Sequence, residues 1–149
     1  MSLSERLRSV NRLFLDTAPV IYFIEENPRY LAQVQPVFDR IDSGSLIAIT
    51  SPITLSECLV HPYRLGQPQA VAAFRELIVY SDNVTFLVID DEIADNAADL
   101  RARYNLTLAD ALQAAAALAA GCDAFLTNDP ALKRVSALDV IVLDEAEGD

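Results

Sequence analysis

Residues 13–19 read LFLDTAP, and the pattern of this short segment recurs along the chain. Three large apolar residues are followed at once by Asp16. Thr17, a candidate helix N-cap, and Pro19, which suits a first helical turn, come next. The segment predicts a short buried strand that ends at an acidic residue and leads directly into a helix.

The same arrangement of apolar run, polar residue and helix start recurs along the chain. Ser51 and Pro52 follow the second apolar run, and an acidic pair at 90–91 opens a predicted helix after the third. In addition to residues 13–15, strands are predicted at 46–50, 84–89, 124–126 and 140–143. Short strands that are apolar throughout and alternate with helices are typical of a parallel sheet covered on both faces.

These elements predict a single α/β domain. We expect a three-layer α/β/α arrangement with a five-stranded parallel sheet spanning residues 1–149. Residues 1–11 are expected to form an N-terminal extension, and residues 144–149 a flexible acidic tail. No internal repeat, low-complexity linker or change in composition marks a second domain.

The composition narrows the class of protein. Of the 149 residues, 52% are hydrophobic, and the mean hydropathy is +0.24, which excludes a disordered chain. No apolar run approaches the ~20 residues that cross a bilayer, and residues 1–12 lack the hydrophobic core of a signal peptide. We therefore expect a cytoplasmic protein. Cys58 and Cys122 are expected to be reduced thiols, with a disulfide between them as the alternative.

The negative net charge is unusual for a protein that binds nucleic acids. Eleven basic residues stand against 22 acidic ones, and the formal net charge is −11. Proteins that bind nucleic acids are usually basic, because phosphate contacts supply most of their affinity. A nuclease of this charge would need metal ions that bridge to phosphate, a few local arginines or a basic partner to compensate. The basic residues that could contact a nucleic acid, although solubility is their simplest role, are Arg12, Arg29, Arg64, Arg101, Arg103, Lys133 and Arg134.

Four acidic residues lie where a parallel sheet places its binding site. Asp16 directly follows the first strand, and Asp129 comes just after the fourth. Glu57 and Asp110 lie in the early part of helices that start near the same edge of the sheet. Clustered carboxylates repel one another unless cations lie among them, and Mg²⁺ prefers such oxygen ligands. The four acids therefore predict a divalent-metal site suited to phosphoryl chemistry.

Each acid also has a purely structural explanation. Thr107 and Asp110 fit a variant of the capping box at a helix start. Asp129 fits a turn and an N-cap, and Glu57 fits a solvated helix face, although apolar neighbours surround it. Asp16 lies between two apolar stretches and is the hardest to explain in this way. A metal site is predicted because all four acids are expected at the same edge of the sheet.

Five stretches, in order along the chain, share the pattern of a known family. They are FLDT at 14–17, LSECLV at 55–60, TLADA at 107–111, FLTND at 125–129 and ALDVIVL at 137–143. Together they resemble the PIN domain, and especially the toxin nucleases of VapBC-type toxin–antitoxin modules. Each motif is weak alone, but their order and spacing extend over nearly the whole chain.

The resemblance implies a PIN-like sheet with an acidic pocket at its C-terminal edge and an Mg²⁺- or Mn²⁺-dependent endoribonuclease. It carries four acidic positions of the family, which are catalytic and metal-binding, onto Asp16, Glu57, Asp110 and Asp129. It also carries a small hydroxyl residue onto Thr127, and it leaves the neighbouring Asn128 without an assigned role. As partners it implies an RNA substrate, a basic antitoxin and a second copy of the chain in a homodimer.

One mechanistic hypothesis follows from these residues. Asp16, Asp110 and Asp129 would hold one Mg²⁺ directly or through water. Glu57 would orient a metal-bound water or help to hold a second ion. A metal-activated water would then attack the phosphodiester and leave 5′-phosphate and 3′-hydroxyl ends.

Other interpretations stay open at this point. The chain could be a PIN-domain RNA-processing or RNA-binding protein without a toxin role, or a binding module without catalysis. A receiver-like phospho-acceptor domain also places acids at strand ends. It expects an acidic pair after the first strand, however, where this chain has Thr17 and Ala18. His61, the one histidine, could act as a general base, although a surface position beside Pro62 is the simpler interpretation.

Overall fold

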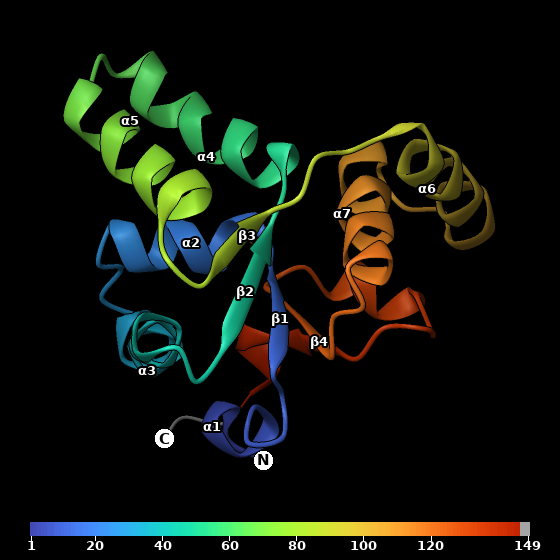
Figure 1. The fold of residues 1–149 in the computed structure, drawn as a ribbon, viewed down its shortest axis with the longest axis horizontal. Helices are drawn as coiled ribbons and strands as arrows, with labels where there is room; N and C mark the ends of the chain where they lie inside the picture. The colour runs from blue at the N-terminus through green and yellow to red at the C-terminus, as the bar shows by residue number, and fades with distance from the viewer. Residues whose placement is uncertain (147–149) are drawn as a thin grey trace.

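A parallel sheet forms the centre of the molecule (Figure 1). The computed structural model of the chain describes residues 1–146. The strands are β1 (Arg12–Leu15), β2 (Ile47–Thr50), β3 (Val84–Phe86), β4 (Ala124–Thr127) and β5 (Val140–Val142). They lie in the order β3-β2-β1-β4-β5, and every neighbouring pair is parallel. The predicted five-stranded parallel sheet is confirmed.

Helices cover both faces of this sheet, as the three-layer α/β/α prediction requires (Figure 1). One face carries α2 (Thr17–Ile24), α3 (Leu31–Ser43), α4 (Pro52–Arg64) and α5 (Pro68–Arg75), which continues into a π-helical turn at Glu76–Tyr80. The other face carries α6 (Asp91–Tyr104) and α7 (Leu108–Ala119). The remaining elements are α1 (Leu3–Arg6) and two 3₁₀ turns at Pro130–Arg134 and Leu143–Glu145.

Alternate residues of the central strands pack into two apolar layers. Leu15 and Leu126 belong to the layer under α2–α5, whereas Phe14 and Phe125 belong to the layer under α6 and α7. The rings of Phe14 and Phe125 stack with their centroids 4.9 Å apart. The alanines at 114–117 of α7 are almost fully buried. These small side chains let α7 lie close to the sheet.

The order of the strands creates a switch point between β1 and β4. The chain leaves β1 towards β2 on one side, yet β4 is hydrogen-bonded to β1 on the other side. The backbone N–H of Asp16 donates to the carbonyl of Leu126 at 3.0 Å, so the two strands end side by side. Parallel α/β sheets bind ligands beside such a point. The order also differs from the 2-1-3-4-5 arrangement of receiver-like domains, which excludes that interpretation.

Capping residues explain where the helices beside this point begin. The Ser51 hydroxyl accepts the backbone N–H of Ile53 at 3.0 Å, and Pro52 occupies the first position of α4. The Thr107 hydroxyl accepts the backbone N–H of Asp110 at 3.2 Å and caps α7. Both helix starts match the sequence prediction.

Two local predictions were wrong. The third strand was expected at 84–89, but it ends at Phe86, because its neighbour β2 ends at Thr50 and leaves no further partner for the ladder. Thr17 was expected to cap the helix after β1, but it is the first helical residue. Asp16 takes the cap position and makes no side-chain capping bond.

Asp144, the first residue of the expected acidic tail, is hydrogen-bonded to other parts of the fold. The Tyr30 hydroxyl donates to the carboxylate of Asp144 at 2.6 Å. The backbone N–H of Asp144 donates to the side-chain oxygen of Asn128 at 2.9 Å. The start of the tail is therefore held against the fold, whereas residues 147–149 lie outside the described part of the chain.

Two expectations from composition concern the thiols and membranes. Cys58 and Cys122 are both free, so the alternative of a disulfide between them is excluded. In residues 1–146, no helix is both long enough and apolar enough to cross a bilayer.

Candidate active site

Asp16 is the most deeply placed acid at the switch point. It follows the last residue of β1, and only 7% of its surface is exposed. Its Oδ2 accepts a hydrogen bond from the Thr127 hydroxyl at 2.7 Å, and its Oδ1 accepts one from the Gln113 amide at 3.3 Å. Burial raises the pKa of Asp16, and these donors partly offset that rise because they favour the ionised form.

Thr127 connects the ends of β1 and β4. It is the fully buried last residue of β4. Its hydroxyl donates to Asp16 and accepts the backbone N–H of Asp129 at 3.0 Å. Asp129 in turn accepts the N–H of Ala131 at 3.0 Å and caps the 3₁₀ turn that follows. Asp129 is thus a turn and N-cap residue, which agrees with the structural explanation given for it above. Its side chain also lines the pocket described below.

Asp110 lies in the first turn of α7, close to Asp129. Its backbone N–H is capped by Thr107, while its half-buried carboxyl group lines the same pocket. Burial raises the pKa of Asp110 to about 7, and the hydrogen bond and negative charge of Asp129 add to this effect. A carboxyl group with such a pKa beside a second acid indicates crowded negative charge.

Glu57 reaches the pocket from α4. The residue is exposed, and its Oε1 accepts a hydrogen bond from the Thr17 hydroxyl at 2.7 Å. Because Thr17 is the first residue of α2, this bond joins the helix that follows β1 to the helix that follows β2. The Glu57 side chain is therefore exposed to solvent, held by a hydrogen bond to Thr17, and part of the pocket lining.

All four predicted acids line one pocket of about 390 Å³ at the carboxyl edge of the sheet. The lining consists of Asp16, Thr17, Ala18, Ile21, Tyr22, Glu57, Asp110, Thr127, Asn128 and Asp129. None of these residues is Lys or Arg, so no cationic side chain lies among the carboxylates. The structure brings together every residue that the sequence placed in the site, Thr127 included.

The donor atoms of the pocket suit a hard divalent cation. The polar side chains that line it offer carboxylate, hydroxyl and amide groups, and no Cys or His is among them. Within residues 1–146, no three acidic, His or Cys side chains are grouped so as to hold a metal ion by themselves. Mg²⁺ is compatible with such an open arrangement, because it keeps several waters and uses one or two carboxylates together with substrate phosphate.

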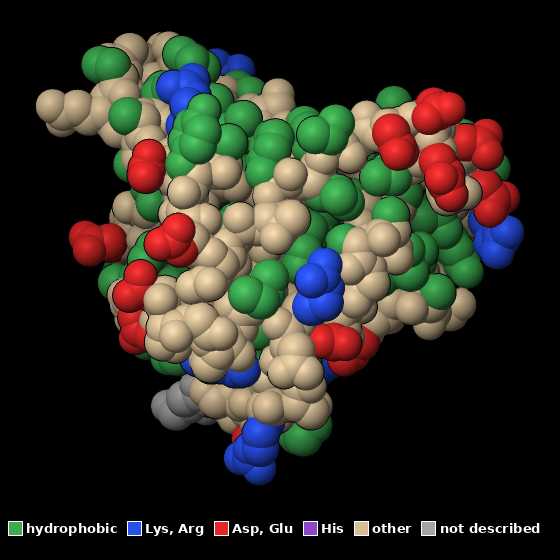
Figure 2. Space-filling view, in the orientation of Figure 1, with side chains coloured by type: hydrophobic (Ala, Val, Ile, Leu, Met, Phe, Trp, Pro, Cys, Tyr) green, Lys and Arg blue, Asp and Glu red, His purple; other side chains and the backbone are tan. Residues whose placement is uncertain are grey.

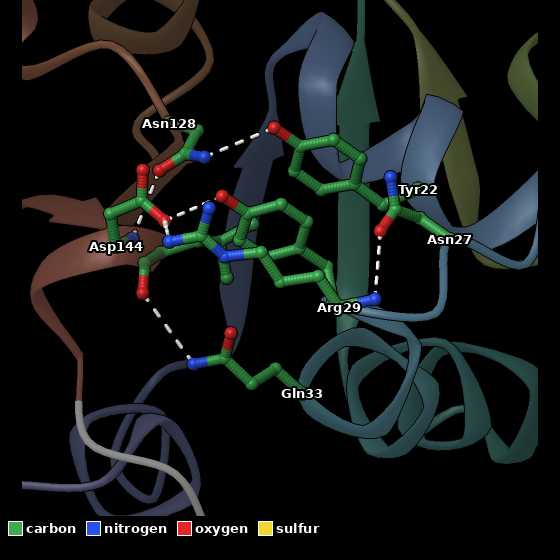
Figure 3. Close-up of polar contacts among 8 residues, drawn as sticks. Tyr22, Asn27, Arg29, Gln33, Asn128 and Asp144 are labelled. Atoms are coloured by element: carbon green, nitrogen blue, oxygen red, sulfur yellow. Dashed lines mark hydrogen bonds and ion pairs between the residues drawn. The ribbon is translucent and has the colours of Figure 1, made fainter.

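Asn128 belongs to a series of contacts at the rim of the pocket (Figure 3). Its amide nitrogen donates to the Tyr22 hydroxyl at 3.0 Å, and its oxygen accepts the N–H of Asp144 at 2.9 Å. The Tyr22 ring stacks on Tyr30 with centroids 4.0 Å apart. Asn128 therefore connects the pocket rim to α2 and to the 3₁₀ turn at Leu143–Glu145.

Gln113 is the polar residue of the site that the sequence reasoning missed. Its side chain is fully buried in α7 and contacts Asp16, Thr54 and Ser51. A signal was present, because Gln113 is the one polar residue in the stretch 111–117 and lies three positions after Asp110.

Two of the basic residues that could contact a nucleic acid, Arg12 and Arg134, instead hydrogen-bond to backbone carbonyls of the fold. Arg12 donates to the carbonyl of Ala120 at 2.8 Å, and Arg134 donates to the carbonyl of Asn105 at 2.9 Å. Both bonds satisfy carbonyl groups at helix ends. His61 is exposed on α4 and does not line the pocket, which agrees with its interpretation as a surface residue.

Comparison with known proteins identifies the family of the chain and proteins of similar fold. The family model of the PIN domain matches residues 13–138. Among solved structures, the DNA-bound VapBC of Salmonella typhimurium is similar at a TM-score of 0.71 and 20% identity, covering 89% of this chain and 98% of that one. VapBC2 of Rickettsia felis, bound to a promoter DNA fragment, is similar at 0.69 and 16%, covering 88% and 98%.

A third similar structure is VapC20 of Mycobacterium tuberculosis, described as a toxin that cleaves the sarcin–ricin loop. Its TM-score is 0.64 at 16% identity, and the match covers 76% of this chain and 86% of that one. No curated protein sequence is similar enough to count as a relative. At these identities the solved structures show a shared fold. The family match extends from β1 to beyond β4 and includes every acid of the pocket, and the chain therefore belongs to the PIN domain family.

Proposed function

We propose that this protein is an endoribonuclease that hydrolyses RNA phosphodiester bonds with the help of Mg²⁺ or Mn²⁺. The observation that carries the proposal is the pocket of four carboxylates, without Lys or Arg in its lining, at the switch point of the sheet. A phosphodiester would be repelled from this pocket unless a cation offset the negative charge. Membership of the PIN family supports the same class of reaction.

The acids differ in the parts that we propose for them. Asp16, Asp110 and Asp129 converge from β1, α7 and the end of β4, and their carboxylates would hold the cation directly or through water. Glu57, fixed by Thr17 on the α4 side, would orient the attacking water or help to hold a second cation. Bound Mg²⁺ or Mn²⁺ would polarise a phosphoryl oxygen and lower the pKa of water. The products would carry 5′-phosphate and 3′-hydroxyl ends.

Incubation of the protein with total RNA tests this activity. We expect cleavage with Mg²⁺ or Mn²⁺, none with EDTA, and the stated end groups when the cut sites are mapped. Asp16→Asn keeps the size of the side chain and removes a charge, so the cleavage rate should fall by about 100-fold. Asp95→Asn makes the same change at an exposed position of α6, outside the pocket, and should cleave like wild type. Cleavage by Asp16→Asn at the wild-type rate would refute the mechanism.

We also propose that the protein is the toxin of a type II toxin–antitoxin pair, with a basic antitoxin as partner and a homodimer as its assembly. Two of the similar structures are VapBC complexes, and the net charge of −11 favours a positively charged partner. Figure 2 shows acidic side chains gathered at the upper right, over α6. The exposed acids of this helix are Asp91, Glu92, Asp95 and Asp99.

Expression in a bacterial host separates a toxin from an RNA-processing enzyme of the same fold. Induction of the wild-type chain alone should stop growth, whereas induction of Asp16→Asn at the same protein level should not. Unchanged growth with wild-type protein that cleaves RNA in vitro would favour the processing role.

A further inference from the structure

We propose that Gln113 is a positioning residue that fixes the Asp16 carboxylate for metal binding, an inference that rests on the proposed metal-dependent function. Gln113 lies on α7, one turn after Asp110, and its side chain is completely buried. A buried amide destabilises the fold unless all its polar atoms are hydrogen-bonded. The partners of Gln113 therefore indicate what it does.

The amide nitrogen of Gln113 has two acceptors. It donates to Oδ1 of Asp16 at 3.3 Å and to the Thr54 hydroxyl at 2.8 Å. The Thr54 hydroxyl passes its own hydrogen to the carbonyl of Leu15 at 3.2 Å, directly before Asp16 in the chain. Gln113 thus holds the Asp16 side chain directly and the backbone of the preceding residue through Thr54.

The amide oxygen of Gln113 faces the start of α4. It accepts a hydrogen bond from the Ser51 hydroxyl, which itself accepts the N–H of Ile53 at 3.0 Å. These partners fix the orientation of the amide, because reversing it would bring its oxygen against the Asp16 carboxylate. In the part of the chain that the structure describes, no buried side-chain nitrogen or oxygen lacks a hydrogen-bond partner, so this set of contacts is complete.

The two oxygens of Asp16 are consequently held from two different elements. Thr127 at the end of β4 donates to Oδ2, and Gln113 from α7 donates to Oδ1. Donors on both sides fix the plane of the carboxylate and leave its remaining lone pairs for a cation in the pocket. Hydrogen-bond partners of metal ligands commonly change metal affinity or activity by about 10–100-fold.

Gln113 also sets the position of a second acid. Asp110 and Gln113 lie three residues apart and so share one face of α7. The bonds from Gln113 to Asp16 and Thr54 hold this part of the helix against the end of β1. They therefore fix the separation of the Asp110 and Asp16 carboxylates across the pocket.

The variant Gln113→Met tests the proposal, because it keeps the length of the side chain and removes the amide. We expect calorimetry with Mn²⁺ to give a Kd about tenfold higher than that of wild type. RNA cleavage at low Mn²⁺ should slow in proportion, with KM for RNA unchanged, and saturating Mn²⁺ should restore most of the rate. Loss of packing alone would not produce this dependence on metal concentration.

Thr50→Val is the matched control. The Thr50 hydroxyl is equally buried and donates to the carbonyl of Ile78 at 2.8 Å, without contact to Asp16. This variant loses a buried hydrogen bond of the same kind and should bind Mn²⁺ like wild type when compared at equal folded fraction. Should Gln113→Met not fold, Ser51→Ala releases the amide oxygen and also removes the N-cap of α4. Compared with wild type at equal folded fraction, it should still raise the Kd for Mn²⁺ by a smaller factor.

The outcomes separate this proposal from the proposed function. If Gln113→Met, or Ser51→Ala in its place, binds Mn²⁺ with the wild-type Kd, the positioning role is wrong and the nuclease proposal stands. If wild type cleaves RNA in EDTA and does not bind Mn²⁺, the proposed metal dependence fails and the positioning role fails with it.

Discussion

Asp16 and Asp110 carry their charges in different surroundings. Burial raises the pKa of Asp16, and the hydrogen bonds that both of its oxygens accept offset this rise only in part. Asp110 is half-buried and lies beside Asp129, which opposes ionisation. A cation in the pocket would favour the ionised form of both acids.

The raised pKa of Asp110 makes the stability of the metal-free protein depend on pH. The pKa is about 7 in the folded protein against a reference of 3.8, so the folded state holds the proton more tightly than the unfolded state does. The stability from this group is complete below about pH 4 and is lost as the pH rises through about 7. Asp110→Asn should raise the free energy of unfolding in EDTA at pH 8 by about 1 kcal/mol, since solvent screens a half-exposed group.

Denaturant titrations in EDTA at pH 5 and pH 8 measure this effect. Wild type should lose stability between the two pH values, and Asp110→Asn should lose less. Asp95→Asn, with its exposed side chain on α6, should keep the wild-type pH dependence. An equal pH dependence in wild type and Asp110→Asn would show that another group is responsible.

Thr127 offers a second prediction for a single residue. Thr127→Val removes the hydroxyl that donates to Asp16 and accepts the N–H of Asp129, while the shape of the side chain is kept. We expect RNA cleavage to slow by about 10–100-fold. Thr127→Ser retains the hydroxyl and should keep most of the activity. Equal rates for the Val and Ser variants, each confirmed as folded by circular dichroism, would contradict this role.

Among the helices and strands, the sequence predicted those that capping residues, proline or apolar runs mark locally. Capping residues and proline mark the starts of α4 and α7, and apolar runs mark the strands. The helices α3 and α5 were not predicted, because Tyr30 and Gln67 at their N-caps make no side-chain capping bond. Pro36 inside α3 further weakens its helical pattern.

The acids of the site could be predicted from the sequence, whereas the buried hydrogen bonds of Gln113 could not. Parallel strands share one carboxyl edge, so strand order alone places Asp16 beside Asp129. The contact between Ser51 and Gln113 joins residues 62 positions apart and exists only because α7 packs beside the start of α4. No local pattern encodes that contact, and therefore the positioning of Asp16 could not be derived from the sequence.

The close approach of α7 to the sheet gives a prediction about this element. Ala116 is fully buried, and Ala116→Leu would force extra volume into a packed layer at a cost of about 1–3 kcal/mol. Ala119→Leu adds the same atoms at an exposed position of the helix and should change stability little. The midpoints of urea denaturation compare the two, and similar midpoints would mean that α7 can move away from the sheet.

For the whole molecule, a cation that binds only the folded state should raise the melting temperature. At a Mn²⁺ concentration about 100 times the Kd, mass action adds about 2.7 kcal/mol, or roughly 5–10 °C for a domain of this size. Asp16→Asn should show a much smaller shift, and EDTA should reverse the shift in wild type. A similar shift in both proteins would place the metal outside the pocket.

The pairing of β1 with β4 also bears on how the protein is made. These neighbours in the sheet are separated in the chain by residues 16–123, and the last acid of the pocket comes only at Asp129. While the chain is being synthesised, Asp16 and Glu57 emerge long before their counterparts, and the non-local strand pair forms late. Under the proposed nuclease function, the pocket of four acids would be complete only after Asp129 has been synthesised and β4 has paired with β1.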